Sequence, residues 1–226
     1  MYFDGTLLLV FPALILSLYA QYKVSSAYNK YSKVRNKKGY TGAEAARQLL
    51  LASKISDVRV EPVHGNLTDH YDPRTMTLRL SEGVYNNPSI AAVGIAAHEA
   101  GHAIQHNTGY GPLGLRSALV PMANIGSKLA IPLIILGLFM GSFGFMYAGI
   151  ILYTAAVVFT LITLPVEFNA SGRAIELLSE YNFLTPDEIT PAKKVLNAAA
   201  LTYVAAALTA VLTLLRFIIL AGGRRD

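Results

Sequence analysis

Long apolar segments alternate with polar ones along the chain, and they set the class of protein. They cover residues 7–20, 117–140, 145–166 and 197–221. The first reaches the roughly 20 residues that a bilayer crossing needs when Tyr2 and Phe3 are counted with it. The uncharged turn 141–144 joins the second segment to the third, which predicts a transmembrane hairpin. We therefore expect a mainly α integral membrane protein with about four transmembrane helices.

The polar region after the first apolar segment shows the periodicities of a small folded unit. Thr41 and Glu44 have the spacing of a capping box, which predicts the start of a short helix. Two stretches alternate apolar and polar side chains, which predicts strands with one buried face each, and these are 58–62 and 76–80. The turn 72–75 allows residues 67–71 to pair with the later strand as a hairpin.

Residues 98–102 read His-Glu-Ala-Gly-His, an H-E-x-x-H motif within a predicted helix over 89–105. Histidines four residues apart lie on one face of a helix, so His98 and His102 can bind one zinc ion while Glu99 serves as a general base. Most other residues of this helix are small, which is typical of a helix packed closely against its neighbours. The polar region is therefore predicted to be a small zincin-like α+β catalytic insert with a short β-sheet.

The composition of the chain limits which residue types can bind a metal and which classes of partner are expected. The chain has 226 residues, 53% of them hydrophobic, a mean hydropathy of +0.42 and no cysteine. Disulfides and thiolate ligands are thereby excluded, so histidine and carboxylate groups must hold any metal. The net charge of +5 is small, and the basic run after the first apolar segment is explained by its place beside a membrane. We expect membrane lipids and peptide or membrane-protein substrates as partners, and no nucleic acid; the oligomeric state stays open.

In addition to His98 and His102, a tetrahedral catalytic zinc needs a third protein ligand. The other histidines and the carboxylates are the candidates. His106 lies on the same helix, but an unbroken helix carries it about 6 Å beyond His102. His64 and His70 lie in the strand region before the motif. Glu167 ends an apolar segment, and a carboxylate in that setting is a functional candidate. We favour Glu167 as the third ligand and assign His106 a structural role or contact with a ligand.

Over nearly its whole length, the chain resembles the YugP-like bacterial membrane-bound neutral zinc metallopeptidases, which are distant relatives of the HtpX and CAAX prenyl proteases. Four separate stretches carry this resemblance. They are residues 67–73, 97–105, 164–171 and 199–206. The resemblance implies zinc as the cofactor, with His98, His102 and Glu167 as its ligands and Glu99 as the general base. Ser171 departs from the pattern, because distant relatives have there an aspartate that orients a histidine ligand.

The activity implied is that of a membrane-embedded zinc-dependent endopeptidase of the gluzincin type, which combines H-E-x-x-H with a glutamate ligand. A zinc-bound water attacks the peptide bond, and Glu99 takes its proton and returns it to the leaving amine. His70, Arg173 and Tyr203 are candidates for stabilising the oxyanion, and the sequence does not rank them. The alternative is a non-proteolytic zinc-stabilised membrane scaffold or adaptor, which would need no general base.

Two other classes of membrane metalloenzyme are excluded. A site-2-type protease pairs H-E-x-x-H with a motif of the Asn-Pro-Asp-Gly type in a later membrane segment, and no such motif occurs in the chain. A di-iron desaturase or hydroxylase needs several histidine boxes, and the chain has only 5 histidines.

These predictions divide the chain into a 1–21 N-terminal transmembrane helix, a 22–116 catalytic insert, a 117–166 transmembrane hairpin, a 167–195 third-ligand helix with its connector, and a 196–226 C-terminal transmembrane helix. Six basic residues between Lys23 and Lys38, against Asp4 before the first segment, favour a cytoplasmic insert. We expect a multi-pass protein of the bacterial inner (plasma) membrane, with its active site facing the cytoplasm and both termini outside. Arg224 and Arg225 oppose a full last crossing, and the alternative is a last helix that stays near the inner face.

Overall fold

Two compact units make up the computed structural model, which describes residues 5–223. Unit 1 comprises Met1–Ala20, Gly114–Pro165 and Thr202–Asp226, and unit 2 comprises Gln21–Leu113 and Val166–Leu201. The residues at the ends that entered the predictions, namely Tyr2, Phe3, Asp4, Arg224 and Arg225, lie outside the described residues.

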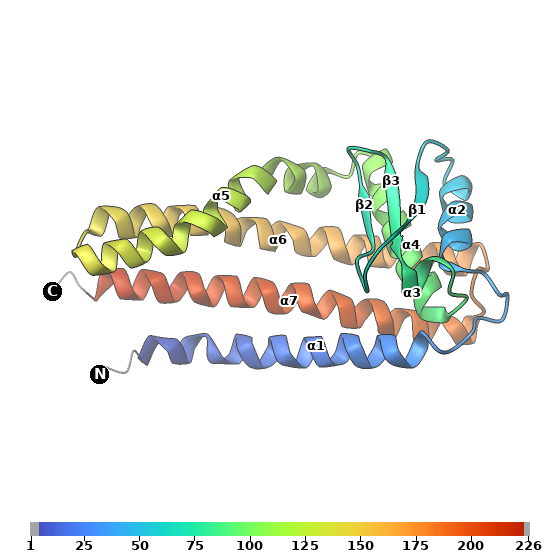
Figure 1. Ribbon diagram of the computed structural model, residues 1–226, viewed down its shortest axis with the longest axis horizontal. Helices are drawn as coiled ribbons and strands as arrows, with labels where there is room; N and C mark the ends of the chain where they lie inside the picture. The colour runs from blue at the N-terminus through green and yellow to red at the C-terminus, as the bar shows by residue number, and fades with distance from the viewer. Residues whose placement is uncertain (1–4, 224–226) are drawn as a thin grey trace. The chain divides into compact units, whose positions relative to one another are not determined.

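The elements follow one another along the chain as drawn in Figure 1. They are η1 (Gly5–Leu9), α1 (Phe11–Tyr31), α2 (Gly42–Ala52), β1 (Arg59–Val63), β2 (His70–Asp72), β3 (Thr77–Ser81), α3 (Glu82–Tyr85), α4 (Ile90–Asn107), α5 (Gly111–Met140), α6 (Phe143–Glu180) and α7 (Pro186–Gly222).

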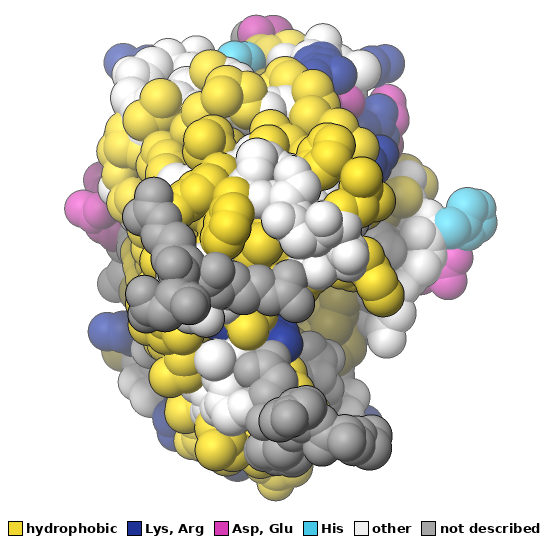
Figure 2. Space-filling view, turned by 90° about the vertical axis from the view of Figure 1, so that its left-hand side faces the viewer, with side chains coloured by type: hydrophobic (Ala, Val, Ile, Leu, Met, Phe, Trp, Pro, Cys, Tyr) yellow, Lys and Arg dark blue, Asp and Glu magenta, His cyan; other side chains and the backbone are white. Residues whose placement is uncertain are grey.

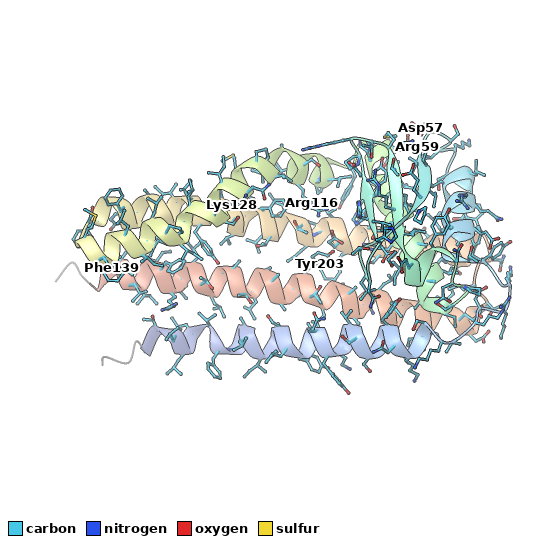
Figure 3. All side chains as sticks on the ribbon, in the orientation of Figure 1. Asp57, Arg59, Arg116, Lys128, Phe139 and Tyr203 are labelled. Atoms are coloured by element: carbon cyan, nitrogen blue, oxygen red, sulfur yellow. The ribbon has the colours of Figure 1, made fainter. Side chains whose placement is uncertain are left out.

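Unit 1 is built from parts of the long apolar helices. Among the described residues, 4 helices are long and apolar enough to cross a membrane, namely Gly5–Tyr31, Gly111–Met140, Phe143–Glu180 and Pro186–Gly222. Phe139, near the end of α5, is 86% exposed (Figure 3), and hydrophobic side chains gather on the upper part of the face shown in Figure 2. Such a surface suits lipid rather than water. The prediction of a mainly helical membrane protein is confirmed.

The predicted hairpin within unit 1 is a closely packed helix pair. A Cβ built on Gly149 of α6 would lie 2.8 Å from the carbonyl oxygen of Ala130 on α5, so only glycine permits this approach. Gly141 follows α5 with a φ of 65°, the left-handed conformation in which glycine commonly ends a helix. The chain therefore turns back at once and continues as α6.

Unit 2 contains the three-stranded sheet, in the order β1-β3-β2. β1 runs parallel to β3, and β2 runs antiparallel to it with Tyr71 opposite Leu78. The expectation of one buried face is wrong for β3, because Thr77 and Ser81 are as fully buried as the leucines between them. Ser81 tolerates burial because its N–H donates to the Asp69 carboxylate at 2.8 Å.

The helices of unit 2 supply most of its core. The capping box predicted at Thr41 and Glu44 is present at the start of α2. α2 packs on α4, and β2 and β3 lie against α4 as well (Figure 1). Fully buried side chains fill the space between these elements, including those of Leu49, Leu50, Leu78, Leu80, Val84 and Val93. This packing holds the H-E-x-x-H helix in a fixed position.

The last two helices are longer than the sequence pattern indicated. α6 runs without a break from its apolar half through Glu167 to Glu180. α7 begins at Pro186, although the predicted break extended to Pro191. The reason is a cap: the Thr185 N–H and hydroxyl both donate to the Glu188 carboxylate, and proline is well suited to the first helical position that follows.

Candidate metal centre

His98 and His102 lie one turn apart on α4, and their side chains face α6. Their ring centroids are 4.7 Å apart and the ring planes are nearly perpendicular, at 85°. Their side chains are only 14% and 12% exposed. The spacing of four residues places both Nε2 atoms at one point beside the helix, as the motif predicts.

Glu167, on α6, brings a carboxylate oxygen to the same point. Its Oε2 atom lies 3.3 Å from His98 Nε2 and 3.6 Å from His102 Nε2, and its side chain is 3% exposed. One ligand atom from each of these three residues lies within 4.8 Å of the others. Of the described residues, this is the only group of three or more His, Asp and Glu side chains that could hold a metal ion.

The geometry of this cluster fits zinc. Ligand atoms about 2.0–2.1 Å from a tetrahedral zinc lie about 3.3–3.4 Å from one another. The two distances from Glu167 Oε2, 3.3 and 3.6 Å, are close to that separation. Two imidazoles and one carboxylate are also the ligand set of several catalytic zinc sites, which keep a fourth position open.

Gly101 allows α6 to come close enough for Glu167 to reach the histidines. A Cβ built on Gly101 would lie 2.7 Å from the carbonyl oxygen of Ala170, one turn beyond Glu167. Any other side chain at this position would push the two backbones apart. The glycine inside the H-E-x-x-H motif is therefore a packing requirement of the site.

Each histidine uses its second ring nitrogen for a hydrogen bond. His98 Nδ1 lies 3.0 Å from the Ser171 hydroxyl oxygen, and His102 Nδ1 lies 3.0 Å from Gln105 Oε1. Such bonds orient the rings of metal-binding histidines. Ser171 thus contacts a histidine directly, although a carboxylate would hold that imidazole more strongly.

The electrostatic environment favours a cation at this point. Burial alone lowers the pKa of His102, but the neighbouring carboxylates of Glu167 and Glu99 more than offset this effect and raise the pKa above its ordinary value. Burial also raises the pKa of Asp69, and the charge of Glu99 adds to this effect. The hydrogen bonds from Ser81 lower this pKa, but by less. The carboxylates of Glu99 and Glu167 therefore favour positive charge at His102.

The histidines outside the cluster have other contacts. His106 Nδ1 lies 2.9 Å from the Tyr71 hydroxyl on β2, one turn beyond His102. His64 pairs with Glu82 at 2.8 Å on the surface. His70 donates from Nδ1 to the carbonyl oxygen of Thr68, two residues before it in the chain.

The candidate oxyanion donors lie on three different elements. His70 is exposed on β2. Arg173 donates from Nε to Asn169 Oδ1 at 2.9 Å on α6. Tyr203 lies on α7 in unit 1 (Figure 3). Among the described residues, His70 and Arg173 form no hydrogen bond or ion pair with His98, His102 or Glu167.

Sequence reasoning missed Gln105 and Asn169. Gln105 follows His102 by three residues, so the two side chains share a helix face, and this spacing is the signal that was available. Asn169 follows Glu167 by only two residues, and nothing in the sequence pattern connects it to Gln105. That contact depends on the packing of α4 on α6.

A chain with 4 candidate membrane helices and a buried cluster of two histidines and a glutamate is a membrane metalloprotein. Residues 6–222 match the family described as "Putative neutral zinc metallopeptidase", and the chain belongs to that family. It is also 50% identical over 218 residues to "Putative membrane protease YugP" of Bacillus subtilis (strain 168), with 96% of this chain and 97% of that protein covered. No solved structure matches the chain. The resemblance seen in the sequence is confirmed, and zinc is the cofactor that the family and the cluster indicate.

Gly101→Ala should weaken zinc binding, because a methyl group against the Ala170 carbonyl oxygen forces α6, and Glu167 with it, away from α4. Overpacking of this kind also costs about 1–3 kcal/mol of stability. The measurement is zinc affinity by chelator competition, together with thermal unfolding in detergent.

The matched control is Gly94→Ala on the same helix, where the new methyl group would meet the Ala192 side chain at an ordinary 3.6 Å. Zinc affinity should stay unchanged there, and stability should rise by up to about 1 kcal/mol because alanine is the better helix former. Equal zinc affinity in both variants would contradict the role given to Gly101.

Proposed function

We propose that the protein is a membrane-embedded zinc-dependent endopeptidase of the gluzincin type. His98, His102 and Glu167 bind the metal, and Glu99 is the general base. The observation that carries the proposal is the convergence of two imidazole Nε2 atoms and one buried carboxylate oxygen, all within 4.8 Å, beside a carboxylate on the same helix. The match to a zinc metallopeptidase family supports the same reaction class.

The chemistry divides between the metal and Glu99. When bound, zinc lowers the pKa of a water toward 7 and polarises the scissile carbonyl group. Glu99 is 8% exposed, and no hydrogen bond to its carboxylate is found among residues 5–223, so the carboxylate is available to a water molecule. Glu99 takes the proton of the attacking water and then delivers it to the nitrogen of the departing amine.

Unit 2 supplies a place for an extended peptide, as expected of a zincin-like insert. β1 and β2 form the two edges of the sheet, so each has backbone groups free to pair with another strand. β2 is the edge next to the metal helix, because its Tyr71 hydroxyl contacts His106 on α4. We place the substrate along β2, as a strand that ends near His98 and His102.

Glu99→Gln should retain zinc and fold normally, yet lower turnover by about 10²- to 10⁴-fold, because the amide keeps the shape of the side chain and cannot accept a proton. The measurement is cleavage of casein by the purified protein in detergent, with zinc content determined on the same sample. His98→Ala, the companion variant, should lose both zinc and activity. Wild-type cleavage by Glu99→Gln would refute the mechanism, and zinc binding without any cleavage by the wild type would favour a scaffold.

Glu167→Gln should reduce zinc occupancy, because an amide oxygen is a much weaker zinc ligand than a carboxylate. His106→Ala should keep stoichiometric zinc, because its imidazole contacts Tyr71 instead of the cluster. Metal analysis of both purified proteins distinguishes the two assignments. Full zinc in Glu167→Gln combined with zinc loss in His106→Ala would reverse them.

The orientation that fits the charge distribution places unit 2 in the cytoplasm of a bacterial cell, at its inner membrane. Basic residues gather in unit 2, both in the run from Lys23 to Lys38 and on α7 at Lys193 and Lys194. α7 runs unbroken to Gly222, which favours a complete last crossing. Arg216 lies within its apolar part, where Nε donates to the Thr6 hydroxyl at 3.2 Å. Both termini would then lie outside.

Because the chain has no cysteine, single introduced cysteines can test this topology. In intact cells, a membrane-impermeant maleimide should label Ser142→Cys, in the turn between α5 and α6, and should label Asp57→Cys in unit 2 only after permeabilisation. A cysteine added after Asp226 should react from outside. Protection of that cysteine would remove the last crossing, and external labelling of Asp57→Cys would invert the orientation.

A further inference from the structure

We propose that Gln105 is the positioning residue for His102, and that it fixes the tautomer of this imidazole while tying it to the helix that carries Glu167. The inference rests on the proposed function, because it takes His102 as a metal ligand. Gln105 is fully buried, with 0% of its surface exposed. A buried amide needs partners at both of its ends.

One end of the Gln105 amide contacts His102, and the other end contacts α6 beside Glu167. Nε2 lies 2.8 Å from the backbone carbonyl oxygen of Val166 and 3.0 Å from Asn169 Oδ1. Oε1 lies 3.0 Å from His102 Nδ1. One side chain on α4 therefore joins a histidine of its own helix to α6 at the residue directly before Glu167.

The direction of these hydrogen bonds follows from groups that cannot reverse their roles. A backbone carbonyl oxygen only accepts, so the NH₂ group of Gln105 must face Val166. The amide oxygen of Gln105 must then face His102 Nδ1, which has to carry the hydrogen. In the neutral ring, Nε2 then has the lone pair and directs it at the cluster, which is the tautomer that binds a metal.

Arg173 sets the same direction from the other end of the network. Its Nε donates to Asn169 Oδ1 at 2.9 Å, and a guanidinium group has no acceptor. Asn169 must therefore present its oxygen to this region, and that oxygen also accepts from Gln105 Nε2. His102 thus donates to Gln105, and both Gln105 and Arg173 donate to Asn169, so each bond of this network has only one possible donor.

His98 has no equivalent constraint. Its Nδ1 faces the Ser171 hydroxyl at 3.0 Å, and a hydroxyl can donate or accept. That contact can orient the ring without selecting a tautomer. The two histidines of the motif therefore differ, and Gln105 is what prepares His102 for the metal before the metal arrives.

Two substitutions at Gln105 separate the two ends of the amide. Gln105→Met has similar length and removes both ends, whereas Gln105→Glu keeps an acceptor for His102 and removes the donor to Val166 and Asn169. The control is Asn36→Leu, which removes another buried amide of unit 2. Asn36 donates to the carbonyl oxygens of Tyr40 and Pro88, each at 2.7 Å, and has no contact with the metal centre.

The first readout is the tautomer of His102 in zinc-free protein, measured by ¹⁵N NMR of the imidazole nitrogens at a pH where the ring is neutral. The wild type and Gln105→Glu should show hydrogen on Nδ1, and Gln105→Met should populate the Nε2–H form. The second readout is zinc affinity by chelator competition. It should fall about 10- to 100-fold in Gln105→Met, the range typical of lost support behind a metal ligand. It should fall less in Gln105→Glu, which keeps the acceptor for His102 but loses the bonds to α6, and it should stay unchanged in Asn36→Leu.

The outcomes separate this inference from the proposed function. If His98→Ala and His102→Ala both keep full zinc, the proposed metal site itself is wrong. If those variants lose zinc while Gln105→Met keeps the wild-type tautomer and zinc affinity, only the role of Gln105 is overturned. Equal losses of zinc affinity in Gln105→Met and Asn36→Leu would likewise overturn it, because the effect would then be one of general stability.

Discussion

The close approach of α4 to α6 at Gly101 is the constraint on which the metal centre depends. α4 can bring two imidazoles to one point by its own periodicity, but it cannot supply the third ligand, because the next turn of the helix lies too far along its axis. The third ligand must come from another backbone. Contact between Gly101 and the Ala170 carbonyl oxygen brings that backbone near enough, and Glu167, one turn earlier on α6, then reaches both histidines.

Burial of this contact requires a partner for every polar group within it. The requirement explains why residues with no direct place in the chemistry gather behind the ligands. Ser171 and Gln105 each form a hydrogen bond with one imidazole Nδ1 atom. Gln105 also donates to the Val166 carbonyl oxygen and to Asn169. The cluster and its support therefore form one polar network inside an apolar core, so a change behind a ligand alters the ligand itself.

α6 contributes to both units of the protein. Its residues up to Pro165 belong to the apolar unit 1, and those from Val166 onward belong to unit 2. Glu167 lies just past this boundary. A carboxylate within the apolar half would be costly in a bilayer, whereas at this position it can be buried among imidazoles. A single continuous helix thus anchors the protein in the membrane and delivers a candidate zinc ligand.

The features that depend on local periodicity and spacing could be predicted from the sequence. They include the membrane segments, the capping box at Thr41, the H-E-x-x-H helix, and the choice of Glu167 as a candidate metal ligand. Each of these follows from residues near one another in the chain. Contacts between distant residues became visible only in the folded chain. They are the parallel pairing of β1 with β3, the close approach of α4 to α6 at Gly101, and the hydrogen bond from Gln105 to Val166, 61 residues away. Side-chain periodicity reports which face of an element is buried, but it does not identify the partner, because many apolar faces are equivalent until the chain packs.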